Sequence, residues 1–368
     1  MIPVTDLSFE GNELAYVTDC IKTGWVSSLG KYVREFEERF GGYCGAKFGI
    51  ATSNGTTALH LALAVLGIGP GDEVLVPTLT FVATANAVVY TGAKPVFVDS
   101  EPRTWNLDAA RIEEKITERS KAIIPVHVYG HPADMDPILE IARRHHLYVI
   151  EDAAEAHGAL YKGRRVGSLG DMSCFSFYGN KIITTGEGGM VLTDNAEWAE
   201  RARRLRDHGM SKEKRYWHPE IGFNYRLTNL QAALGVAQLE RIDGIIAAKR
   251  RNAALYNDLL RDVPGVSLPP EAPWAQSVYW MYSILVEDQY GRSRDELMKE
   301  LKASEIDSRP FFYPIHTMPP YLPGSQGQEF PIAVELSRKG LNLPSSATLT
   351  PQQINQICQA IQEGGRER

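Results

Sequence analysis

Two residues of this sequence have surroundings that would change their chemistry. Asp152 follows the apolar residues 148–150 and therefore ends a candidate buried strand, where loss of water raises the pKa of a carboxyl group unless a cation partners it. Lys181 lies in the segment SFYGNKIITTGEGG, between a candidate strand and a glycine-rich turn. A lysine in apolar surroundings loses its proton more readily and can attack a carbonyl carbon. Pyridoxal phosphate requires such a lysine and an acid for its ring nitrogen, although a surface ion pair explains the two residues equally well.

Residues 54–57 form a candidate phosphate site at the start of a predicted helix. The helix follows from the apolar run TTALHLALAVLGI, and the free N–H groups of its first turn attract an anion. Ser176 would add a hydroxyl beside Lys181, and Phe81, on the loop after a candidate strand, would stack on a flat ring. The alternatives are an ordinary N-cap by Ser53 or Asn54 for the first site and a core position for Phe81.

Short apolar strands alternate with helices over most of the chain. The candidate strands are 73–77, 95–99, 121–130, 147–152, 174–179 and 189–194, and the candidate helices are 54–66, 83–90, 107–116, 136–145 and 230–260. This alternation predicts an α/β fold with a mostly parallel sheet covered on both faces. Ligands of such sheets bind beyond the carboxyl ends of the strands, which is where the residues above are expected to lie.

The C-terminal third has a different pattern. A proline-rich segment, 264–273, separates the long candidate helix from a strand at 279–286, and helices at 293–303 and 351–363 follow. We therefore predict a large domain of residues 1–244 and a smaller α+β domain of residues 245–368, which residues 1–20 can join.

Composition and charge exclude several classes of protein. The net charge of −6 argues against a nucleic-acid partner. The longest apolar stretch, 58–68, is too short to span a membrane, and the first residues turn acidic before any apolar run, unlike a signal peptide. The four cysteines are scattered without metal-ligand spacing, which predicts reduced thiols in the cytoplasm and no metal. The lack of a G-x-G-x-x-G motif after the first strand argues against a nicotinamide dehydrogenase.

Seven segments resemble, in order and spacing, the motifs of the DegT/DnrJ/EryC1/StrS family of sugar-nucleotide aminotransferases. They are NGTTALHLAL, GDEVLVPTLTFVATANAV, PVFVD, EDAAEAHGA, GSLGD, FSFYGNKIITTGEGGM and GFNYRLTN, and the resemblance extends from Gly24 to Pro344. It implies fold type I of the pyridoxal 5'-phosphate (PLP) dependent aminotransferases, a large α/β domain with a smaller α+β C-terminal domain. It also implies PLP as cofactor and a homodimer with shared active sites.

The resemblance implies a role for each candidate residue. Lys181 would form an imine with the cofactor and then act as general acid and base, Asp152 would pair with the pyridine nitrogen, and Phe81 would stack on the ring. The phosphate would be held by Gly55, Thr56 and Ser176, and by Asn224 of the neighbouring subunit. Glu155 stands where much of the family has glutamine, near the phenolic oxygen, which a carboxylate would repel unless it is protonated.

The segments EDAAEA, GNKIITTGEGGM and SRPFFYPIHTMPPY are most similar to those of family members that form GDP-perosamine. The expected reaction moves the amino group of L-glutamate to GDP-4-keto-6-deoxy-D-mannose, for a surface polysaccharide such as an O-antigen. The candidate substrate residues are Trp25, Ser27, Ser28, Arg309 and His316, with Arg226 for the donor carboxylate or the dimer; a packed turn and ordinary surface groups are the alternatives.

Other functions stay open at this point. A dTDP- or UDP-linked sugar with a 3- or 4-keto group is an alternative substrate. A PLP-dependent keto-sugar dehydratase of the same fold would replace the lysine by histidine, so Lys181 argues against it. A non-catalytic homologue would be expected to lose Lys181 or Asp152, and both are present.

Overall fold

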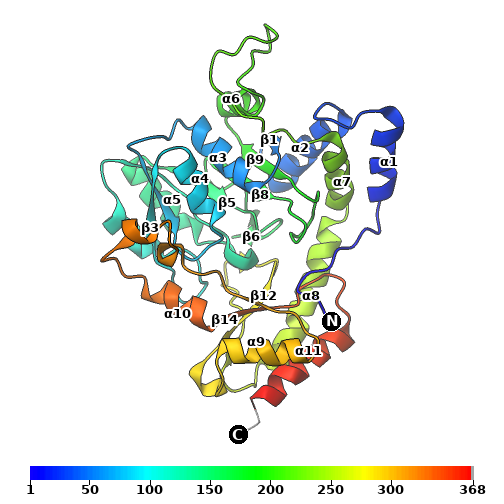
Figure 1. Cartoon of the computed structure of the whole chain (residues 1–368), viewed down its shortest axis with the longest axis vertical. Coiled ribbons are helices and arrows are strands. Elements are labelled where there is room, and N and C mark those ends of the chain that lie inside the picture. Colours follow the sequence, from blue (N-terminus) through cyan, green and yellow to red (C-terminus); the bar gives the residue numbers. More distant parts are fainter. Residues whose placement is uncertain (366–368) are drawn as a thin grey trace.

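The computed structural model describes residues 1–365, and its largest element is a sheet of mixed direction (Figure 1). Within these residues seven strands follow the order β1-β9-β8-β5-β4-β2-β3. They are β1 (Phe48–Thr52), β2 (Glu73–Pro77), β3 (Lys94–Val98), β4 (Ser120–Ile123), β5 (Tyr148–Asp152), β8 (Met172–Ser176) and β9 (Gly189–Thr193). Strand β9 runs antiparallel to β1 and β8, and the other neighbours pair in parallel. The predicted α/β fold is confirmed.

Helices pack on this sheet and bury its strands. Every residue of β2, β8 and β9 is buried, as a sheet covered on both faces requires. The helices of this part are α1 (Glu13–Thr23), α2 (Lys31–Cys44), α3 (Gly55–Val65), α4 (Ala83–Tyr90), α5 (Met135–His145), α6 (Ala196–Arg206) and α7 (Asn229–Leu239). Helix α3 packs against β8 and β9, so its first turn lies beside the ends of these strands.

A second, antiparallel sheet has the order β10-β12-β14-β13 and its own apolar cluster. Its strands are β10 (Val266–Ser267), β12 (Tyr282–Val286), β13 (Arg309–Pro310) and β14 (Gly340–Leu343), and α8 (Ile242–Leu260), α9 (Arg294–Ala303), α10 (Pro331–Lys339) and α11 (Pro351–Gly364) accompany it. A short third sheet joins β6 (Leu160–Tyr161), β7 (Arg164–Arg165) and β11 (Ala275–Gln276). Ile2 belongs to the second apolar cluster and pairs with Ile306. The division at residue 244 stays a prediction, and α8 runs across that position.

Two expected elements of the large sheet region are wrong or too long. The helix expected at 107–116 is instead two short 3-10 turns, because its buried apolar residues Leu107 and Ile112 are five positions apart and cannot share one helix face. The strand expected at 121–130 ends at Ile123, since Pro125 has no N–H with which to continue the ladder. After the strand, residues Val128–Gly130 form a short 3-10 turn, in which Gly130 has a φ of +98°.

The single helix expected at 230–260 is broken between α7 and α8. Arg241 has a φ of −112° and a ψ of 0°, outside the helical range. Side chains of the N-terminal segment hold this break: Asn12 and Tyr16 donate to Glu240, while Arg241 donates to Ser8 and Glu10. No proline lies near the break, and the nearest glycines, Gly235 and Gly244, lie inside α7 and α8, so the contacts with the N-terminal segment explain it.

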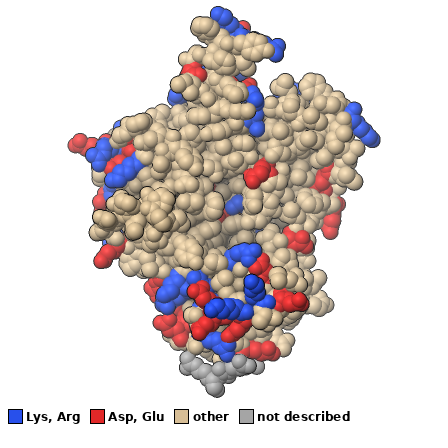
Figure 2. Space-filling view, viewed as in Figure 1, with Lys and Arg blue, Asp and Glu red and all other residues tan. Residues whose placement is uncertain are grey.

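The surface differs between the two sheet regions (Figure 2). The part around α9 and α11 carries many charges of both signs, whereas the face over the large sheet is mostly uncharged. A loop of residues 207–222 projects beyond α6 and exposes Tyr216, Trp217 and Ile221. Among residues 1–365, no helix has the length and apolar character that crossing a membrane requires.

Candidate active site

The first turn of α3 forms a cradle against the end of β8. Asn54 caps the helix: its side chain accepts from the Thr57 amide at 2.9 Å, and the Thr57 hydroxyl accepts from the Asn54 amide. The amides of Gly55 and Thr56 precede this bond and have no acceptor within the helix. A Cβ on Gly55 would lie 2.7 Å from the Cβ of Ser176, so only glycine lets the turn approach this serine. Two amides and one hydroxyl thus converge where a phosphate group binds well.

Asp152 lies at the carboxyl end of β5 and is buried. Its Oδ2 accepts from the Thr84 hydroxyl at 2.7 Å and its Oδ1 from the Ala154 amide at 3.2 Å. Burial raises the pKa of Asp152, and these two hydrogen bonds only partly oppose the shift. Both donors are uncharged, so the carboxylate would gain most from a cationic ligand. A protonated pyridine nitrogen is such a ligand.

Lys181 and Glu155 meet in the same buried region. The Nζ of Lys181 lies 3.9 Å from Oε1 of Glu155, and the lysine side chain is 11% exposed. Burial lowers the pKa of Lys181, while Glu155 and Asp152 oppose that shift. Burial raises the pKa of Glu155 to about 7, against the charge of Lys181 and a 2.8 Å hydrogen bond from the Tyr129 amide. Burial therefore makes the neutral amine easier to form than in water, as a nucleophilic lysine requires.

Two aromatic side chains, Trp280 and Phe81, are relevant to the binding of a flat ligand. The Lys181 ammonium lies 3.8 Å from the ring centroid of Trp280, which comes from the chain just before β12. Phe81, after β2, is 55% exposed and its ring is 5.9 Å from that of Phe312. An exposed phenyl ring at this strand end is available to stack on a flat ligand.

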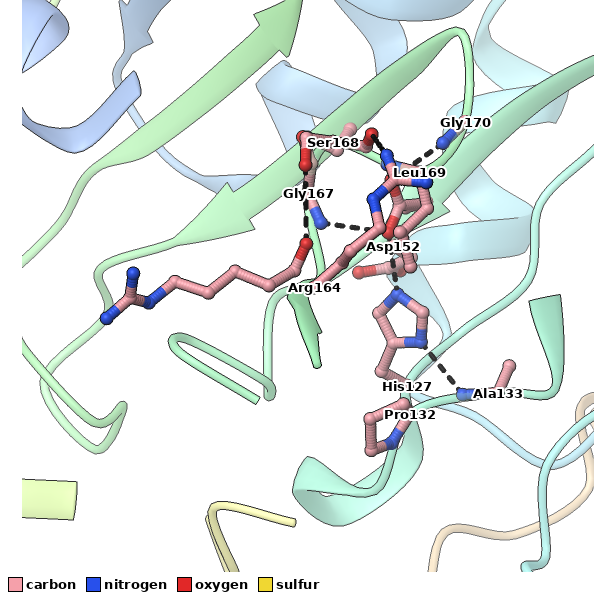
Figure 3. Close-up of polar contacts among 12 residues, drawn as sticks. His127, Pro132, Ala133, Asp152, Arg164, Gly167, Ser168, Leu169 and Gly170 are labelled. Carbon is pink, nitrogen blue, oxygen red and sulfur yellow. Dashed lines mark hydrogen bonds and ion pairs between the residues drawn. The ribbon is translucent and has the colours of Figure 1, made fainter. Parts of the chain in front are cut away.

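Glu151, which precedes Asp152 in β5, organises a buried network, and Figure 3 labels its partners His127, Gly167, Leu169 and Gly170. Its carboxylate accepts from Nε2 of His127 at 3.1 Å and from the amides of Gly167, Leu169 and Gly170 at 2.7–2.9 Å. Burial alone would raise the pKa of Glu151, but the hydrogen bonds from His127 and the amides lower it. The GSLGD motif, which had no assigned role, thus supplies backbone donors that fix the strand carrying Asp152.

We expect Glu151→Ala to lower the free energy of unfolding by about 3 kcal/mol or more, because it leaves several buried donors without an acceptor. Chemical denaturation at neutral pH measures the loss. Glu113→Ala provides a matched control, since Glu113 accepts from His145 at 3.0 Å on the surface, and its loss should stay within about 0.5 kcal/mol. A Glu151→Ala loss as small as that of the control would contradict the role of the network.

The predicted substrate residues have mixed surroundings. Trp25 and Ser27 are exposed on the loop between α1 and α2, which the buried Asn229 holds through the Trp25 and Ser27 carbonyls. Trp25 and Ser28 line a cavity of about 730 Å³. His316 is buried and its Nδ1 lies 2.7 Å from the Thr78 hydroxyl.

The remaining predicted contacts lie on the surface of this chain. Arg309 pairs with Asp307 in the second sheet region, and Arg226 pairs with Asp207. Asn224 is exposed beside the projecting loop, where its backbone bridges to that of Asp207. The contacts described for Arg309, Arg226 and Asn224 do not join them to Lys181, so their roles stay predictions.

Sequence reasoning missed three residues of the site: Thr84, Tyr129 and Trp280. Thr84 stands on the apolar helix α4, and only its approach to Asp152 distinguishes it from a core threonine. Tyr129 has a φ of +54°, uncommon for a non-glycine residue, yet nothing in the sequence marks it. Trp280 lies about a hundred residues from Lys181 in the chain, and its position depends on how the second sheet packs against the first.

These residues fit PLP. The cradle of Gly55, Thr56 and Ser176 suits a phosphate, the buried Asp152 suits a protonated ring nitrogen, and Lys181 suits an aldehyde. The fold and site therefore define a PLP-dependent aminotransferase of fold type I.

The comparisons with known proteins agree. The chain belongs to the DegT/DnrJ/EryC1/StrS aminotransferase family, whose profile matches residues 8–362. It is 52% identical to the GDP-perosamine synthase of Caulobacter vibrioides and 47% identical to that of Escherichia coli O157:H7, with 98% of each chain covered in both cases. The crystal structure of Streptomyces venezuelae DesV with a ketimine intermediate is 38% identical, with a TM-score of 0.91 over 97% of this chain and 95% of DesV. The resemblance predicted from the motifs is confirmed.

Proposed function

We propose that this chain transfers the amino group of L-glutamate to the keto carbon of GDP-4-keto-6-deoxy-D-mannose, forming GDP-perosamine. The observation that carries the reaction class is the placement of Lys181 beside Glu155, with Asp152 at the same strand end. The choice of sugar is supported by the two GDP-perosamine synthases of nearly equal length to which the chain is similar.

The chain's own residues have distinct tasks in this reaction. The amides of Gly55 and Thr56 and the hydroxyl of Ser176 hold the phosphate, and Phe81 stacks on the ring. Asp152 keeps the ring nitrogen protonated, because an unshielded carboxylate in a buried site favours a bound cation. PLP, when bound, supplies an electron-accepting ring joined to the nitrogen that is transferred.

Lys181 moves the protons. Its Nζ removes the proton from Cα of glutamate, and in the second half of the reaction it delivers a proton to the sugar carbon that receives nitrogen. Burial supports this role, since it lowers the pKa of Lys181. Glu155, whose pKa burial raises to about 7, can hold a proton there and donate a hydrogen bond to the phenolic oxygen instead of repelling it.

The test of the substrate is a panel of sugar nucleotides. Purified protein is incubated with GDP-, dTDP- and UDP-linked 3-keto and 4-keto sugars and glutamate, and the aminated products are identified by mass. We expect the GDP-linked 4-keto sugar to be converted most efficiently. Faster conversion of a dTDP- or UDP-linked sugar would replace the proposed substrate while leaving the aminotransferase chemistry intact.

We also propose a homodimer in which each active site takes residues from both subunits. Asn224 is exposed, and the adjacent loop of residues 207–222 projects from the molecule with Tyr216 and Ile221 in solvent. Large exposed apolar side chains on a projecting loop are typical of an interaction surface. In this arrangement Asn224 contacts the phosphate that is bound beside the partner's Ser176.

A mixed dimer tests this arrangement. We expect Lys181→Ala and Asn224→Asp, each inactive alone, to recover activity when their subunits are mixed, up to about half that of a normal dimer for each heterodimer. One site of the heterodimer then carries both substitutions and the other carries neither. Turnover and the fraction of heterodimer are measured on the same sample. Heterodimers without activity would place Asn224 in its own subunit's site or outside any site.

We also propose a division into two domains and a location in the cell. The two-domain division at residue 244 is supported by the separate apolar cluster of the second sheet. We propose a cytoplasmic enzyme whose product supplies a surface polysaccharide, such as the O-antigen of a lipopolysaccharide. Limited proteolysis around residue 244 and analysis of the polysaccharide in a deletion strain test these two points.

A further inference from the structure

The amine of Lys181 lies close both to the carboxyl group of Glu155 and to the face of an indole ring. Its Nζ is 3.9 Å from Oε1 of Glu155 and 3.8 Å from the ring centroid of Trp280. A cation within about 6 Å of an aromatic face is attracted by the ring's quadrupole, and tryptophan attracts it most strongly. This attraction grows when water is excluded, and Trp280 is buried.

Two contacts fix the indole ring, and close packing fixes the backbone of Trp280. Its Nε1 donates to the carbonyl of Asn180, the residue before Lys181, at 2.7 Å. The ring of Tyr129 lies nearly parallel to it, at an interplanar angle of 17° and a centroid distance of 6.3 Å. A Cβ on Gly130 would lie 2.7 Å from the Trp280 amide nitrogen, so the backbone is packed closely there. The indole therefore presents a fixed face to the lysine.

Four titratable side chains near Lys181 and Trp280 bear on the charge of the amine. Burial lowers the pKa of Lys181, and Glu155 and Asp152 on the β5 side oppose the shift. Burial lowers the pKa of the nearby His157 to about 3, so this imidazole is neutral near pH 7. Burial also raises the pKa of the Tyr129 hydroxyl, which therefore stays protonated. The two carboxylates and the indole face thus all favour the charged amine.

We propose that Trp280 is a positioning residue, which binds the free ammonium of Lys181 on its indole face and holds it beside Glu155 while the lysine is not attached to the cofactor. This inference rests on the proposed function, because the lysine must be released and recaptured in each catalytic cycle. An amine held in one position needs no search before it moves a proton or reattaches. The second sheet region thereby acts on a residue of the first.

The pKa of Lys181 in the full-length, cofactor-free protein tests the proposal. Lysines labelled with ¹³C at the ε-carbon are followed by NMR against pH, and Lys181→Arg identifies the Lys181 signal. We expect Trp280→Leu to lower the pKa by about one unit, a tenfold larger acid constant, because leucine covers the amine without attracting it. Trp280→Phe should lower it less, since a phenyl face binds a cation more weakly.

The direction of the change separates this role from a structural one. If Trp280 only covered the site, its replacement would admit water and raise the pKa of Lys181 toward its ordinary value. Trp274→Leu is the control, because Trp274 packs on Tyr161 and His131 instead, and the pKa of Lys181 should not change. An unchanged or raised pKa in Trp280→Leu overturns the proposal, and if this variant fails to fold, the same outcome in Trp280→Phe does so.

The test does not depend on turnover. Amino-transfer activity retained by Lys181→Ala would reject the proposed role of Lys181 in the reaction, while the effect of Trp280 on the Lys181 pKa in the wild-type chain could still be measured. Conversely, suppose that the Trp280 variants leave the pKa of Lys181 unchanged or raise it, and that Lys181→Ala is inactive. These results together would reject only the positioning role of Trp280.

Discussion

Lys181→Ala is expected to abolish amino transfer, lowering turnover by at least about a thousandfold. The substitution removes the amine that lies 3.9 Å from Glu155 and 3.8 Å from the ring centroid of Trp280, and neither the carboxyl group nor the indole can replace it as a nucleophile. Turnover is measured with glutamate and the sugar nucleotide chosen from the panel. The visible absorbance of a lysine-bound cofactor should also disappear.

A second lysine provides the control for this experiment. Lys162 is exposed and pairs with Asp136, and Lys162→Ala should keep near wild-type turnover. PLP that stays bound to Lys181→Ala without turnover agrees with the proposal, because the contacts of Gly55, Thr56 and Ser176 with the phosphate do not need the lysine. Near wild-type turnover of Lys181→Ala would remove Lys181 from the mechanism.

Asp152→Asn should lower turnover by about a hundredfold or more and leave the cofactor-free protein at least as stable as the wild type. A neutral amide cannot keep the ring nitrogen protonated, so the ring accepts electrons less well. Burial raises the pKa of Asp152 in the folded chain above its unfolded value. The stability that the protonated acid contributes is therefore lost as the pH rises through the folded pKa. Above that pKa, asparagine avoids the cost of a buried, ionised carboxylate.

Turnover and thermal unfolding without PLP check the two halves of this prediction separately. Asp136→Asn is the control for the charge change, because Asp136 lies on the surface with Lys162 as its partner, and its turnover should be normal. If Asp152→Asn works within a few-fold of the wild type, the pairing with the ring nitrogen is wrong. A large loss of stability would instead show that Asp152 has a structural task shared with Thr84.

Local sequence patterns predicted many elements at or near their observed bounds. Helix α4 and strand β2 lie where the apolar patterns place them, at 83–90 and 73–77. Helix α3 starts after Asn54, which caps it with its side chain and was one of the two N-cap candidates in the sequence. These features depend on interactions within a few residues, namely helical periodicity, capping and strand burial. Such interactions can be recognised without knowing the rest of the fold.

A long-range contact decided one of the elements that were predicted incorrectly, and a local proline decided another. Residues 230–260 carry a helical pattern, yet side chains from the N-terminal segment bind Glu240 and Arg241 and separate α7 from α8. The strand after residue 121 is shorter than expected because Pro125 cannot continue the ladder. Pro125 is present in the sequence and indicates that a central strand ends near it. The apolar residues on both sides of the proline suggested a longer strand instead.

The sequence by itself determined the alternation of strands and helices, the family, and the residues Asp152, Lys181 and Gly55 as candidates for PLP binding. Only the tertiary structure decided what surrounds them: Thr84 on Asp152, the Tyr129 amide on Glu155, and the indole of Trp280 over Lys181. The physical reason is that a side chain's type follows from the sequence, whereas its pKa and orientation depend on burial and on neighbours. Those neighbours come from distant segments, which the parallel crossovers and the second sheet bring together at one end of β5.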